Sequence, residues 1–442
     1  MRIVIVGAGA VGSYLAERLS IEGQDVVVID NDPVKVDLLQ SSLDILAIQG
    51  NGASPVILEA AGIDKAELLI AVTNNDAVNV LACHAAARLG VPRKIARVED
   101  SALRDELQIL GVDVVIDPEE QLAKDLLLLV SEGGISEHAT FGDGALSLIG
   151  GFVQPDAPLS NITLEELRNQ TTDWQWLVTA IVRGGEPFVA RGESIVEQGD
   201  HVLIATPTEL VEDLAPLLGI TIHKAKRVMI FGAGRLARVT ANLLCENGIA
   251  VTLIDKEEAA TRLVADECQG VIVVHGDPMD PELLRQEGIE SVDDVLALTK
   301  WDEVNVVASL VARGLGAKNA IARYHRLDYV SLLNETRVDS GVSSRLSAAN
   351  AILRYVRRGR VQSVVTFQDS NLEAIELQVD PSSDSIGKSL AEIGLPKTAI
   401  VAGIIRNSQA IVPRGDSIIH PGDHVVAIAL PDAVSTVEKT FS

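Results

Sequence analysis

The sequence predicts an α/β fold with two doubly wound parallel sheets, each followed by a small α+β module. Two observations predict this fold. The 442-residue chain contains one type of segment twice, as "IVIVGAGAVGSYLAERLSIEGQDVVVID" (3–30) and "VMIFGAGRLARVTANLLCENGIAVTLID" (228–255). After each segment, short apolar runs alternate with helical stretches, which is the pattern of parallel β-α-β units.

The elements of the first copy follow in order. "RIVIV" (2–6) is a continuous apolar run and predicts a buried parallel strand, followed by a glycine turn and a helix over about 11–22. Further strands are expected at "DVVVID" (25–30), "ILAIQG" (45–50), "ELLIAVT" (67–73) and "KIARVE" (94–99). A long amphipathic helix is expected over 118–134, and its counterpart in the second copy over 343–359.

The register of the two copies indicates a duplication. Gly7 and Gly232 are 225 positions apart, as are Asp30 and Asp255, and Arg97 and Arg323 are 226 apart. A smaller unit is also repeated, at 188–207 and 410–431, with β-branched runs and Gly-Asp turns. We therefore expect four domains, two large and two small in alternation, at 1–134, 135–222, 223–359 and 360–442.

Composition narrows the class of protein. Hydrophobic residues make up 47% of the chain but aromatic residues only 3%, which suits aliphatic parallel strands. The net charge of −25 disfavours nucleic acid. Three widely separated cysteines indicate a reducing compartment. The N-terminus shows no signal-peptide pattern and the longest aliphatic run is 126–130, so we expect a cytoplasmic protein without a membrane span.

The glycine turn carries the main chemical signal, because its context is that of a Rossmann-like nucleotide site. Gly7, Gly9 and Gly12 form GxGxxG between a strand and a helix. The first glycine allows the tight turn, the second lets a pyrophosphate approach and the third permits helix–strand packing. Asp30 ends the second strand, where a carboxylate binds both ribose hydroxyls and repels a 2′-phosphate. The second copy has Ala237 at the third glycine position, which that packing tolerates, and keeps Asp255.

Other polar residues are expected at the same carboxyl edge of each sheet. Asn51 and Asp277 follow the third strand, and Thr73-Asn74 and Thr299-Lys300 follow the fourth. Arg97 and Arg323 end the fifth strands and could reach a phosphate or form ion pairs. This set does not distinguish NAD, NADH, ADP and ATP, although Asp30 argues against NADP.

Several weaker signals have structural explanations. "IGKS" (386–389) lacks the first glycine of a P-loop, and Ser389 with Glu392 fits a capping box, as does Thr163 with Glu166. His420 and His424 are separated by Pro421-Gly422, which disfavours a helical metal pair. Asp76 and Asp302 are interpreted as helix N-caps rather than as catalytic acids.

No catalytic arrangement is evident beside the nucleotide folds. The modules after them contain no recognisable nucleophile motif or paired acid and base, so no catalytic residue or metal ligand is predicted. Three hypotheses remain: a sensor whose ligand changes its shape, an NAD-dependent oxidoreductase with a duplicated fold, and an assembly scaffold with vestigial sites.

The order of modules and the run GAGAVG…VVVID…QGNGA…AVTNNDAVN…IAR resemble the Trk system potassium uptake proteins of the TrkA type over essentially the whole chain. The large modules look like RCK (KTN) nucleotide-binding domains and the small ones like their C-terminal companions. The chain departs from the family pattern at Asn51 and at Lys300-Trp301. Carried over by position, the resemblance implies these site residues: Gly7, Ala8, Gly9, Ala10, Val11, Gly12, Asp30, Asn51, Thr73, Asn74 and Arg97 in the first copy, and Gly232, Ala233, Gly234, Arg235, Leu236, Asp255, Asp277, Thr299, Lys300 and Arg323 in the second.

The resemblance also implies a role. It implies a non-enzymatic regulatory subunit that gates a potassium-translocating membrane protein, with NAD(H), and ATP or ADP at one or both sites, as allosteric ligands. It implies a homotetramer that forms a ring of eight RCK domains, held on the inner face of the membrane through its partner. Binding to nucleic acid or directly to lipid is not expected.

Overall fold

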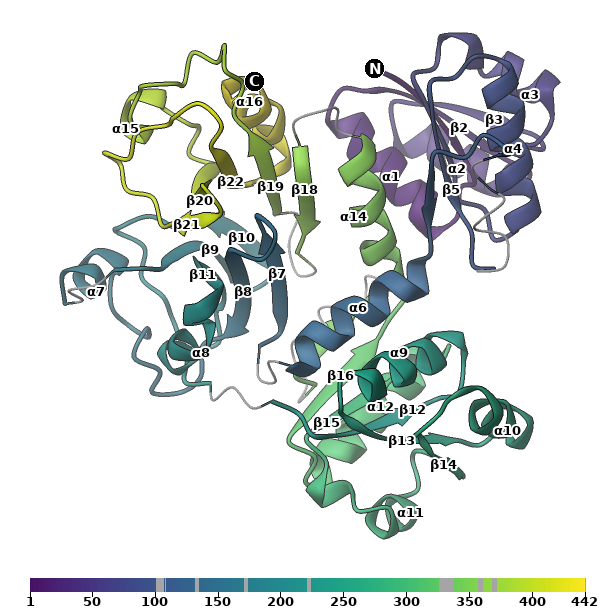
Figure 1. Ribbon diagram of the computed structural model, residues 1–442, viewed down its shortest axis with the longest axis vertical. Helices are drawn as coiled ribbons and strands as arrows, with labels where there is room; N and C mark the ends of the chain where they lie inside the picture. The colour runs from purple at the N-terminus through teal and green to yellow at the C-terminus, as the bar shows by residue number, and fades with distance from the viewer. Residues whose placement is uncertain are drawn as a thin grey trace. The chain divides into compact units, whose positions relative to one another are not determined.

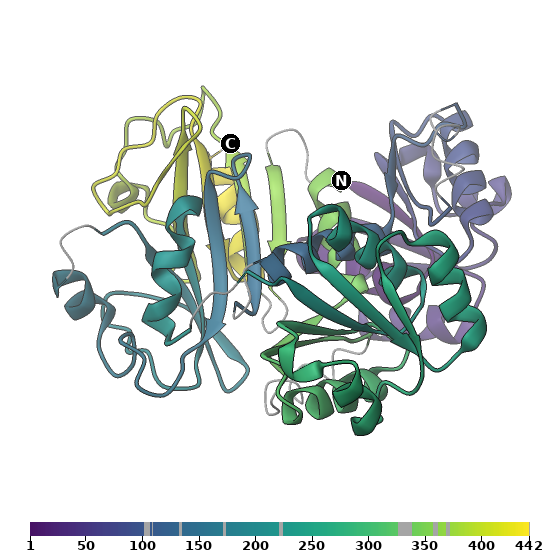
Figure 2. The same ribbon diagram turned by 60° about the horizontal axis from the view of Figure 1, so that its bottom comes forward.

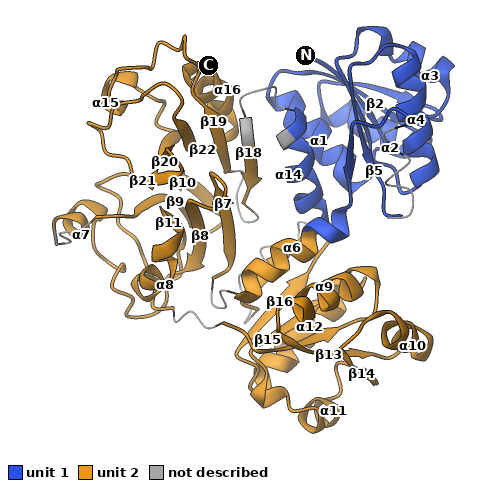
Figure 3. Cartoon of the chain, viewed as in Figure 1, with its two compact units in different colours: residues 1–121, 344–358 blue, residues 122–343, 359–442 orange. Residues whose placement is uncertain are grey.

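The computed structural model describes most of the chain, and its element order matches the duplication (Figure 1). The described residues are 1–100, 107, 109–131, 135–170, 174–220, 224–325, 338–356, 361–367 and 372–441. Parts of the expected long helices, 132–134 and 357–359, lie outside them. The chain forms two compact units, 1–121 with 344–358 and 122–343 with 359–442 (Figure 3).

The first unit contains a six-stranded parallel sheet of order β3-β2-β1-β4-β5-β6. Its strands are β1 (Arg2–Val6), β2 (Asp25–Asp30), β3 (Leu46–Gln49), β4 (Leu68–Ala71), β5 (Arg93–Arg97) and β6 (Val114–Ile116). Its helices are α1 (Ala10–Ile21), α2 (Pro33–Ser42), α3 (Pro55–Ala60), α4 (Asp76–Arg88) and, from the second half of the sequence, α14 (Ser344–Val356), with the 3₁₀ turn Ile63–Lys65. The five strands that the sequence predicts are confirmed, and β6 is an additional short strand.

The second unit repeats this sheet in the order β14-β13-β12-β15-β16-β17. Its strands are β12 (Arg227–Phe231), β13 (Ala250–Asp255), β14 (Ile272–His275), β15 (Asp294–Ala297), β16 (Asn319–Arg323) and β17 (Ser340–Val342). Its helices are α9 (Arg235–Glu246), α10 (Glu258–Glu267), α11 (Pro281–Gln286) and α12 (Asp302–Gly314), with the 3₁₀ turn Ile289–Ser291. In both sheets the order reverses beside the first strand of the copy, and this switch point is where doubly wound sheets bind ligands.

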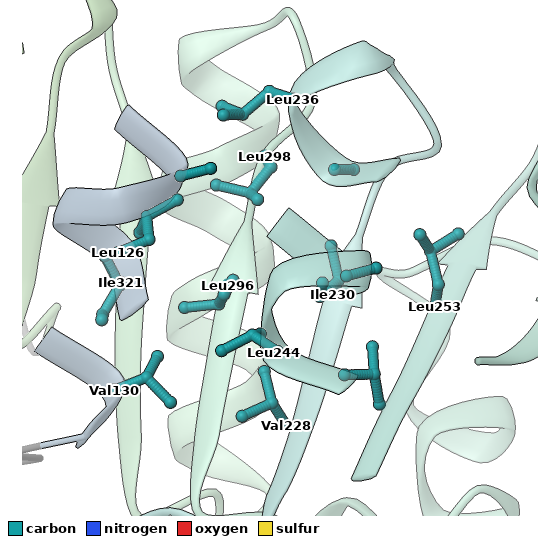
Figure 4. Close-up of a cluster of buried hydrophobic side chains, with 14 of the residues drawn as sticks. Leu126, Val130, Val228, Ile230, Leu236, Leu244, Leu253, Leu296, Leu298 and Ile321 are labelled. Atoms are coloured by element: carbon teal, nitrogen blue, oxygen red, sulfur yellow. The ribbon is translucent and has the colours of Figure 1, made fainter. Parts of the chain in front are cut away.

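The two long connecting helices pack on the sheet of the other half of the sequence. α6 (Pro118–Ser131) buries Leu126 and Val130 in a cluster with Val228, Ile230 and other residues of the second sheet (Figure 4). In the first unit, α14 lies against α1 and beside β6, with the guanidinium of Arg345 5.0 Å from the ring centre of Tyr14. Each parallel sheet is therefore completed by a helix from the other copy.

Both small modules form five-stranded antiparallel sheets with the same topology, β7-β8-β11-β9-β10 and β18-β19-β22-β20-β21. The first contains β7 (Glu137–Phe141), β8 (Leu146–Phe152), β9 (Leu177–Arg183), β10 (Glu186–Val189), β11 (His201–Pro207), α7 (Leu164–Gln170), α8 (Val211–Leu214) and the 3₁₀ turns Thr208–Leu210 and Ala215–Leu218. The second contains β18 (Val361–Thr366), β19 (Glu373–Gln378), β20 (Ala399–Arg406), β21 (Gln409–Ile411), β22 (His424–Ala429), α15 (Leu390–Ile393) and α16 (Pro431–Phe441).

The two antiparallel sheets lie side by side (Figure 2). They share one apolar core. Phe141 and Leu146 of the first sheet belong to the same buried cluster as Ile405 and Val426 of the second. The approach is close, because a Cβ built on Gly403 would lie 2.4 Å from a methyl carbon of Leu146. The duplicated small modules therefore bury their apolar faces against each other within one chain.

A buried carboxylate anchors the start of the second parallel sheet. Both backbone N–H groups of Lys226 and Arg227 donate to Asp293, at 2.7 and 3.0 Å, and the Lys318 ammonium lies 2.7 Å from its other oxygen. Burial raises the pKa of Asp293, but these hydrogen bonds and the Lys318 charge outweigh it and lower the pKa to about 2. The carboxylate of Asp293 is thus ionised in the folded protein, and its hydrogen bonds and ion pair stabilise the fold.

Among the described residues, no helix has the length and apolar character to cross a bilayer.

Candidate functional site

The first glycine turn joins β1 to α1 at the switch point of the sheet. Gly7 has φ +108°, a conformation that favours glycine, and its N–H donates to the Ile29 carbonyl at 2.8 Å. A Cβ on Gly12 would lie 1.8 Å from the Gly7 oxygen, so the close packing of helix on turn requires glycine there. A Cβ on Gly9, in contrast, would meet no other described atom within 4 Å.

The start of α1 is open to a ligand. Gly9 is the N-cap residue, with an extended backbone, and none of the described side chains caps the helix. Ala10 is exposed, whereas Ala8 and Val11 are buried. The first backbone N–H groups of a helix have no intrahelical acceptor and carry a partial positive charge, so this end fits a phosphate.

The second turn repeats this conformation at its first two glycines. Gly232 has φ +107°, and Gly234 is the N-cap of α9 with open space at its Cβ position among the described atoms. Ala237 occupies the third glycine position and is fully buried, so the expectation that this packing tolerates alanine is confirmed. Arg235 is the first residue of α9 and is half-buried, and Leu236 and Ala233 are buried.

A carboxylate lies beside each turn, as the sequence predicts, and it also supports the turn. Asp30 accepts hydrogen bonds from the N–H groups of Ala8 at 2.6 Å and Asp32 at 2.9 Å. Asp255 accepts from Ala233 at 2.7 Å and Glu257 at 2.8 Å in the same way. Each aspartate therefore links the end of the second strand to the glycine turn and fixes where a ribose would meet a carboxylate.

The loop after the fourth strand of each sheet is held by an asparagine that is not among the predicted site residues. The Asn79 amide oxygen accepts from the Thr73 N–H at 2.9 Å and the Thr73 hydroxyl at 2.7 Å. The Asn79 amide nitrogen donates to the carbonyls of Thr73 and Arg97, at 3.0 and 2.8 Å. Asn79 is fully buried and so connects the ends of β4 and β5, while Asn74 is exposed beside it.

Asn305 makes the same four hydrogen bonds with Thr299 and Arg323, at 2.6–3.0 Å. Asn79 and Asn305 occupy matching positions in the two copies, and this match was the sequence signal for their shared role. In both copies the loop adjoins the glycine turn, because a Cβ on Gly7 would lie 3.0 Å from the Thr73 nitrogen and one on Gly232 3.1 Å from the Thr299 nitrogen.

The remaining predicted site residues lie at the same edge of their sheets. Asn51 and Asp277 are exposed, two residues past β3 and β14, and each side chain accepts a backbone N–H two residues ahead, from Ala53 at 3.0 Å and Met279 at 2.9 Å. Arg97 ends β5 and forms an ion pair with Glu99. Arg323 ends β16 and is half-buried, and Lys300 is exposed.

The interpretation of Asp76 and Asp302 as N-caps is wrong. The N-caps of α4 and α12 are Asn75, whose side chain accepts from the Val78 N–H, and Trp301. Asp76 instead accepts from the N–H groups of Glu99 and Asp100 at 3.0 Å. Asp302 lies 2.7 Å from His325 Nδ1. Both carboxylates bind the chain that follows the fifth strand, so the sequence identified an acidic first turn but not its partner.

Both capping boxes that the sequence predicts are confirmed. Ser389 and Glu392 form a capping box on α15, and Thr163 and Glu166 exchange the corresponding hydrogen bonds before α7. His424 pairs with Glu376 at 2.9 Å.

Among the described residues, no group of three or more His, Cys, Asp or Glu side chains could hold a metal ion. Burial raises the pKa of the Cys83 thiol to about 12, which keeps it protonated and unreactive.

Comparison with known proteins identifies the family. The TrkA-N domain family matches residues 3–118 and 228–344, and the TrkA-C domain family matches 152–219 and 374–442. A Trk system potassium uptake protein TrkA of Haemophilus influenzae is 33% identical over 453 residues, covering 100% of this chain and 98% of that protein. A TrkA homolog of Archaeoglobus fulgidus is 33% identical over 445 residues, with 100% of both chains covered.

Solved structures share the fold. A structure described as a GsuK channel bound to NAD has a TM-score of 0.60 at 20% identity and covers 100% of this chain and 78% of its own. The GsuK RCK domain has the same TM-score and identity, with 94% of that chain covered. Because the two pairs of family domains span most of the sequence and the relatives match from end to end, this chain belongs to the family of Trk system potassium uptake proteins of the TrkA type.

Proposed function

We propose that the chain is the regulatory subunit of a Trk-type potassium uptake system and that it binds nucleotides as allosteric ligands. The observation that carries the proposal is the duplicated turn, in which a glycine N-cap leaves the helix start open and an aspartate lies at the end of the neighbouring strand. Relatives named as TrkA potassium uptake proteins, matched over the whole chain, support the transport role.

The proposed ligands are NAD(H), with ATP or ADP at one or both sites. Solved structures described as the GsuK channel bound to NAD and GsuK bound to ADP support this choice of nucleotides. The helix starts would hold the phosphates, and Asp30 and Asp255 the riboses. The other proposed contacts are the remaining residues of the two turns, with Asn51, Thr73, Asn74 and Arg97 in the first site and Asp277, Thr299, Lys300 and Arg323 in the second.

The nucleotide would act by binding, without turnover. A ligand shifts a conformational equilibrium only by its difference in affinity for the two states, so one state of the assembly must bind it better. The relatives reported above are named for potassium uptake, which favours this role over the oxidoreductase alternative. We propose four domains in the chain, at 1–134, 135–222, 223–359 and 360–442.

The test is a titration of the full chain with NAD, NADH, ADP and ATP, combined with a hydride-transfer assay over small hydroxy and amino acids. Saturable binding without reduction of NAD is the expected result. Turnover would favour the oxidoreductase alternative, and the absence of binding to all four nucleotides would favour a scaffold with vestigial sites.

We further propose that four chains assemble into a ring of eight nucleotide domains on the cytoplasmic face of the membrane. The partner is the potassium-translocating subunit, whose cytoplasmic loops would be rich in Lys and Arg, and the charge of −25 complements such loops. Light scattering should give the mass of a tetramer, and a stable monomer would contradict it. Docking to the partner should weaken as salt rises, whereas anionic vesicles and DNA should not bind.

A further inference from the structure

The arginine that ends β5 in the first copy is bound by a carboxylate of its own chain. The Arg97 guanidinium and the Glu99 carboxylate form an ion pair. The two side chains remain 25% and 38% exposed, so the pair lies at the surface of the carboxyl edge and within reach of solvent. The charge of Arg97, a proposed ligand contact, is therefore already shared with an acid.

The fold fixes the backbone on both sides of this pair. The Arg97 carbonyl accepts a hydrogen bond from the Asn79 amide at 2.8 Å, and Asn79 also binds Thr73 beside the glycine turn. The Glu99 N–H donates to Asp76, in the first turn of α4, at 3.0 Å. Both residues of the pair are thus attached to α4, so the Glu99 carboxylate is held close to Arg97.

The pair lies on the face of the sheet that α1 covers. Side chains alternate along a strand, and Ala96 belongs to the buried cluster that contains Cys83 of α4, so its neighbour Arg97 lies on the opposite face. Arg93, on the same face as Arg97, donates to the carbonyls of the last two residues of α14, and α14 packs against α1. Because α1 begins at the glycine turn, the pair shares a face and an edge of the sheet with the phosphate site.

The second copy keeps the backbone contact but has no carboxylate at the matching position. His325 occupies the position of Glu99, and its N–H donates to Asp302 at 3.0 Å, as the Glu99 N–H does to Asp76. The His325 side chain also contacts Asp302, with Nδ1 2.7 Å from the carboxylate. The turn after the fifth strand therefore forms without an acid at this position, and its geometry does not explain the Glu99 side chain.

We propose that the Glu99 carboxylate occupies the place of a ligand phosphate on Arg97, so that nucleotide binding at the first site exchanges one anion for the other. This inference rests on the proposed nucleotide-binding function. Arginine presents the same fork of donors to a carboxylate and to a phosphate, so the two anions compete for it. Glu99 thus lowers the affinity of the first site, because the apparent affinity falls with the fraction of chains in which Arg97 is available to the ligand.

The test removes the charge of Glu99 and keeps the size of its side chain. Glu99→Gln is made in a Gly234→Asp background, in which a carboxylate in open space beside the start of α9 closes the second site. Calorimetric titration with NAD, ADP and ATP should give affinities at least ~3-fold higher than in the Gly234→Asp protein, because a partly exposed ion pair no longer opposes binding. Unchanged or lower affinity would overturn the inference.

A double-mutant comparison shows whether Glu99 acts through Arg97. In the same background, Arg97→Gln should weaken nucleotide binding, and in its presence Glu99→Gln should no longer strengthen it. A merely structural role of Glu99 would not produce this coupling. An equal gain with and without Arg97 would assign Glu99 a direct repulsion of the ligand, and that result would overturn the proposed exchange.

Salt dependence gives a second readout. When Glu99 is neutral, binding adds a charge interaction at Arg97 instead of exchanging one. The affinity of Glu99→Gln should therefore fall more steeply with added salt than the affinity of the protein that retains Glu99. Equal salt dependence in the two proteins would contradict the exchange.

The matched control is an ion pair at the opposite edge of the same sheet. The guanidinium of Arg2, at the start of β1, lies 3.1 Å from the carboxylate of Asp25, at the start of β2. Asp25→Asn changes the net charge by the same amount as Glu99→Gln and should leave nucleotide affinity unchanged. An equal gain in both variants would show that net charge alone decides, and this would also overturn the inference.

A second variant covers the case in which Glu99→Gln does not fold. Glu99→His installs the residue of the second copy and should also raise the affinity at about pH 8, where histidine is mostly neutral. A thermal melt of each variant checks the fold. Nucleotide binding without a gain in a folded Glu99 variant would overturn the inference alone, whereas a failure of the unaltered chain to bind NAD, NADH, ADP or ATP would overturn the proposed function itself.

Discussion

Gly9→Asp is the sharpest test of the first phosphate site, because the structure separates its effect on the ligand from its effect on the fold. Gly9 has φ −75°, within the range of any residue, and its Cβ position meets no other described atom within 4 Å. Aspartate is a preferred N-cap, so α1 should gain a few tenths of a kcal/mol over glycine. The folded protein should therefore keep its melting temperature or melt slightly higher.

The ligand should be repelled strongly. A carboxylate about 4–6 Å from a phosphate charge costs roughly 3–4 kcal/mol at an effective dielectric constant of about 20. This corresponds to a loss of affinity of at least ~100-fold. By comparison, removing Asp30 would disturb the turn as well as the ribose contact, because its carboxylate holds the Ala8 N–H.

The assay is calorimetric titration of NAD together with a thermal melt, with Gly9→Asn as the matched control. Asparagine has nearly the same size and caps a helix equally well but carries no charge, so it should retain tighter binding than aspartate. Unchanged NAD affinity in Gly9→Asp would refute the assignment of phosphate to this helix start. Equal losses for Asp and Asn would show that space, and not charge, decides.

Three further predictions concern stability, each measured by urea unfolding of the full chain. Asn79→Ala leaves buried N–H and carbonyl groups of the β4 and β5 ends without their partner and should lower the unfolding free energy by about 2–4 kcal/mol; a change below ~0.5 kcal/mol would contradict its linking role. Asp293→Asn should cost about 2 kcal/mol at pH 7, because the folded pKa of about 2 lies below the ordinary 3.8 and the carboxylate stabilises the fold above pH ~4. That difference should disappear as the pH falls from ~4 through ~2, and a pH-independent difference would argue against the ionised group. Leu126→Ala should cost about 2–5 kcal/mol because Leu126 is fully buried against the second sheet, whereas Leu128→Ala, at an exposed position of the same helix, should have little effect.

Local patterns in the sequence were sufficient to predict most of the fold. Apolar runs of strand length, glycines at φ > 0 turns and the aspartate at the end of the second strand each depend on neighbours within about 30 residues. The strands around Gly7 and Asp30 were accordingly found where expected, as were the capping box at Ser389 and the position of Arg97 at the end of β5.

The roles of polar side chains were harder to predict from the sequence. Asp76 is of a residue type that often caps helices. Its carboxylate oxygen instead accepts a hydrogen bond from the backbone N–H of Glu99 after β5, 23 residues away. The role of Asn79 likewise depends on bringing the ends of two strands together. Such roles follow from packing in three dimensions, and the only sequence signal for Asn79 was that Asn305 repeats it.

The sequence by itself determined two parallel sheets, two small modules and a nucleotide-type turn in each half, because hydrophobic periodicity and turn chemistry are local. Only the tertiary structure decided that α6 completes the second parallel sheet and α14 the first. The physical reason is the duplication itself. Both sheets present nearly the same apolar face, so the pattern of a helix specifies that it must be buried without specifying which of two similar faces will bury it.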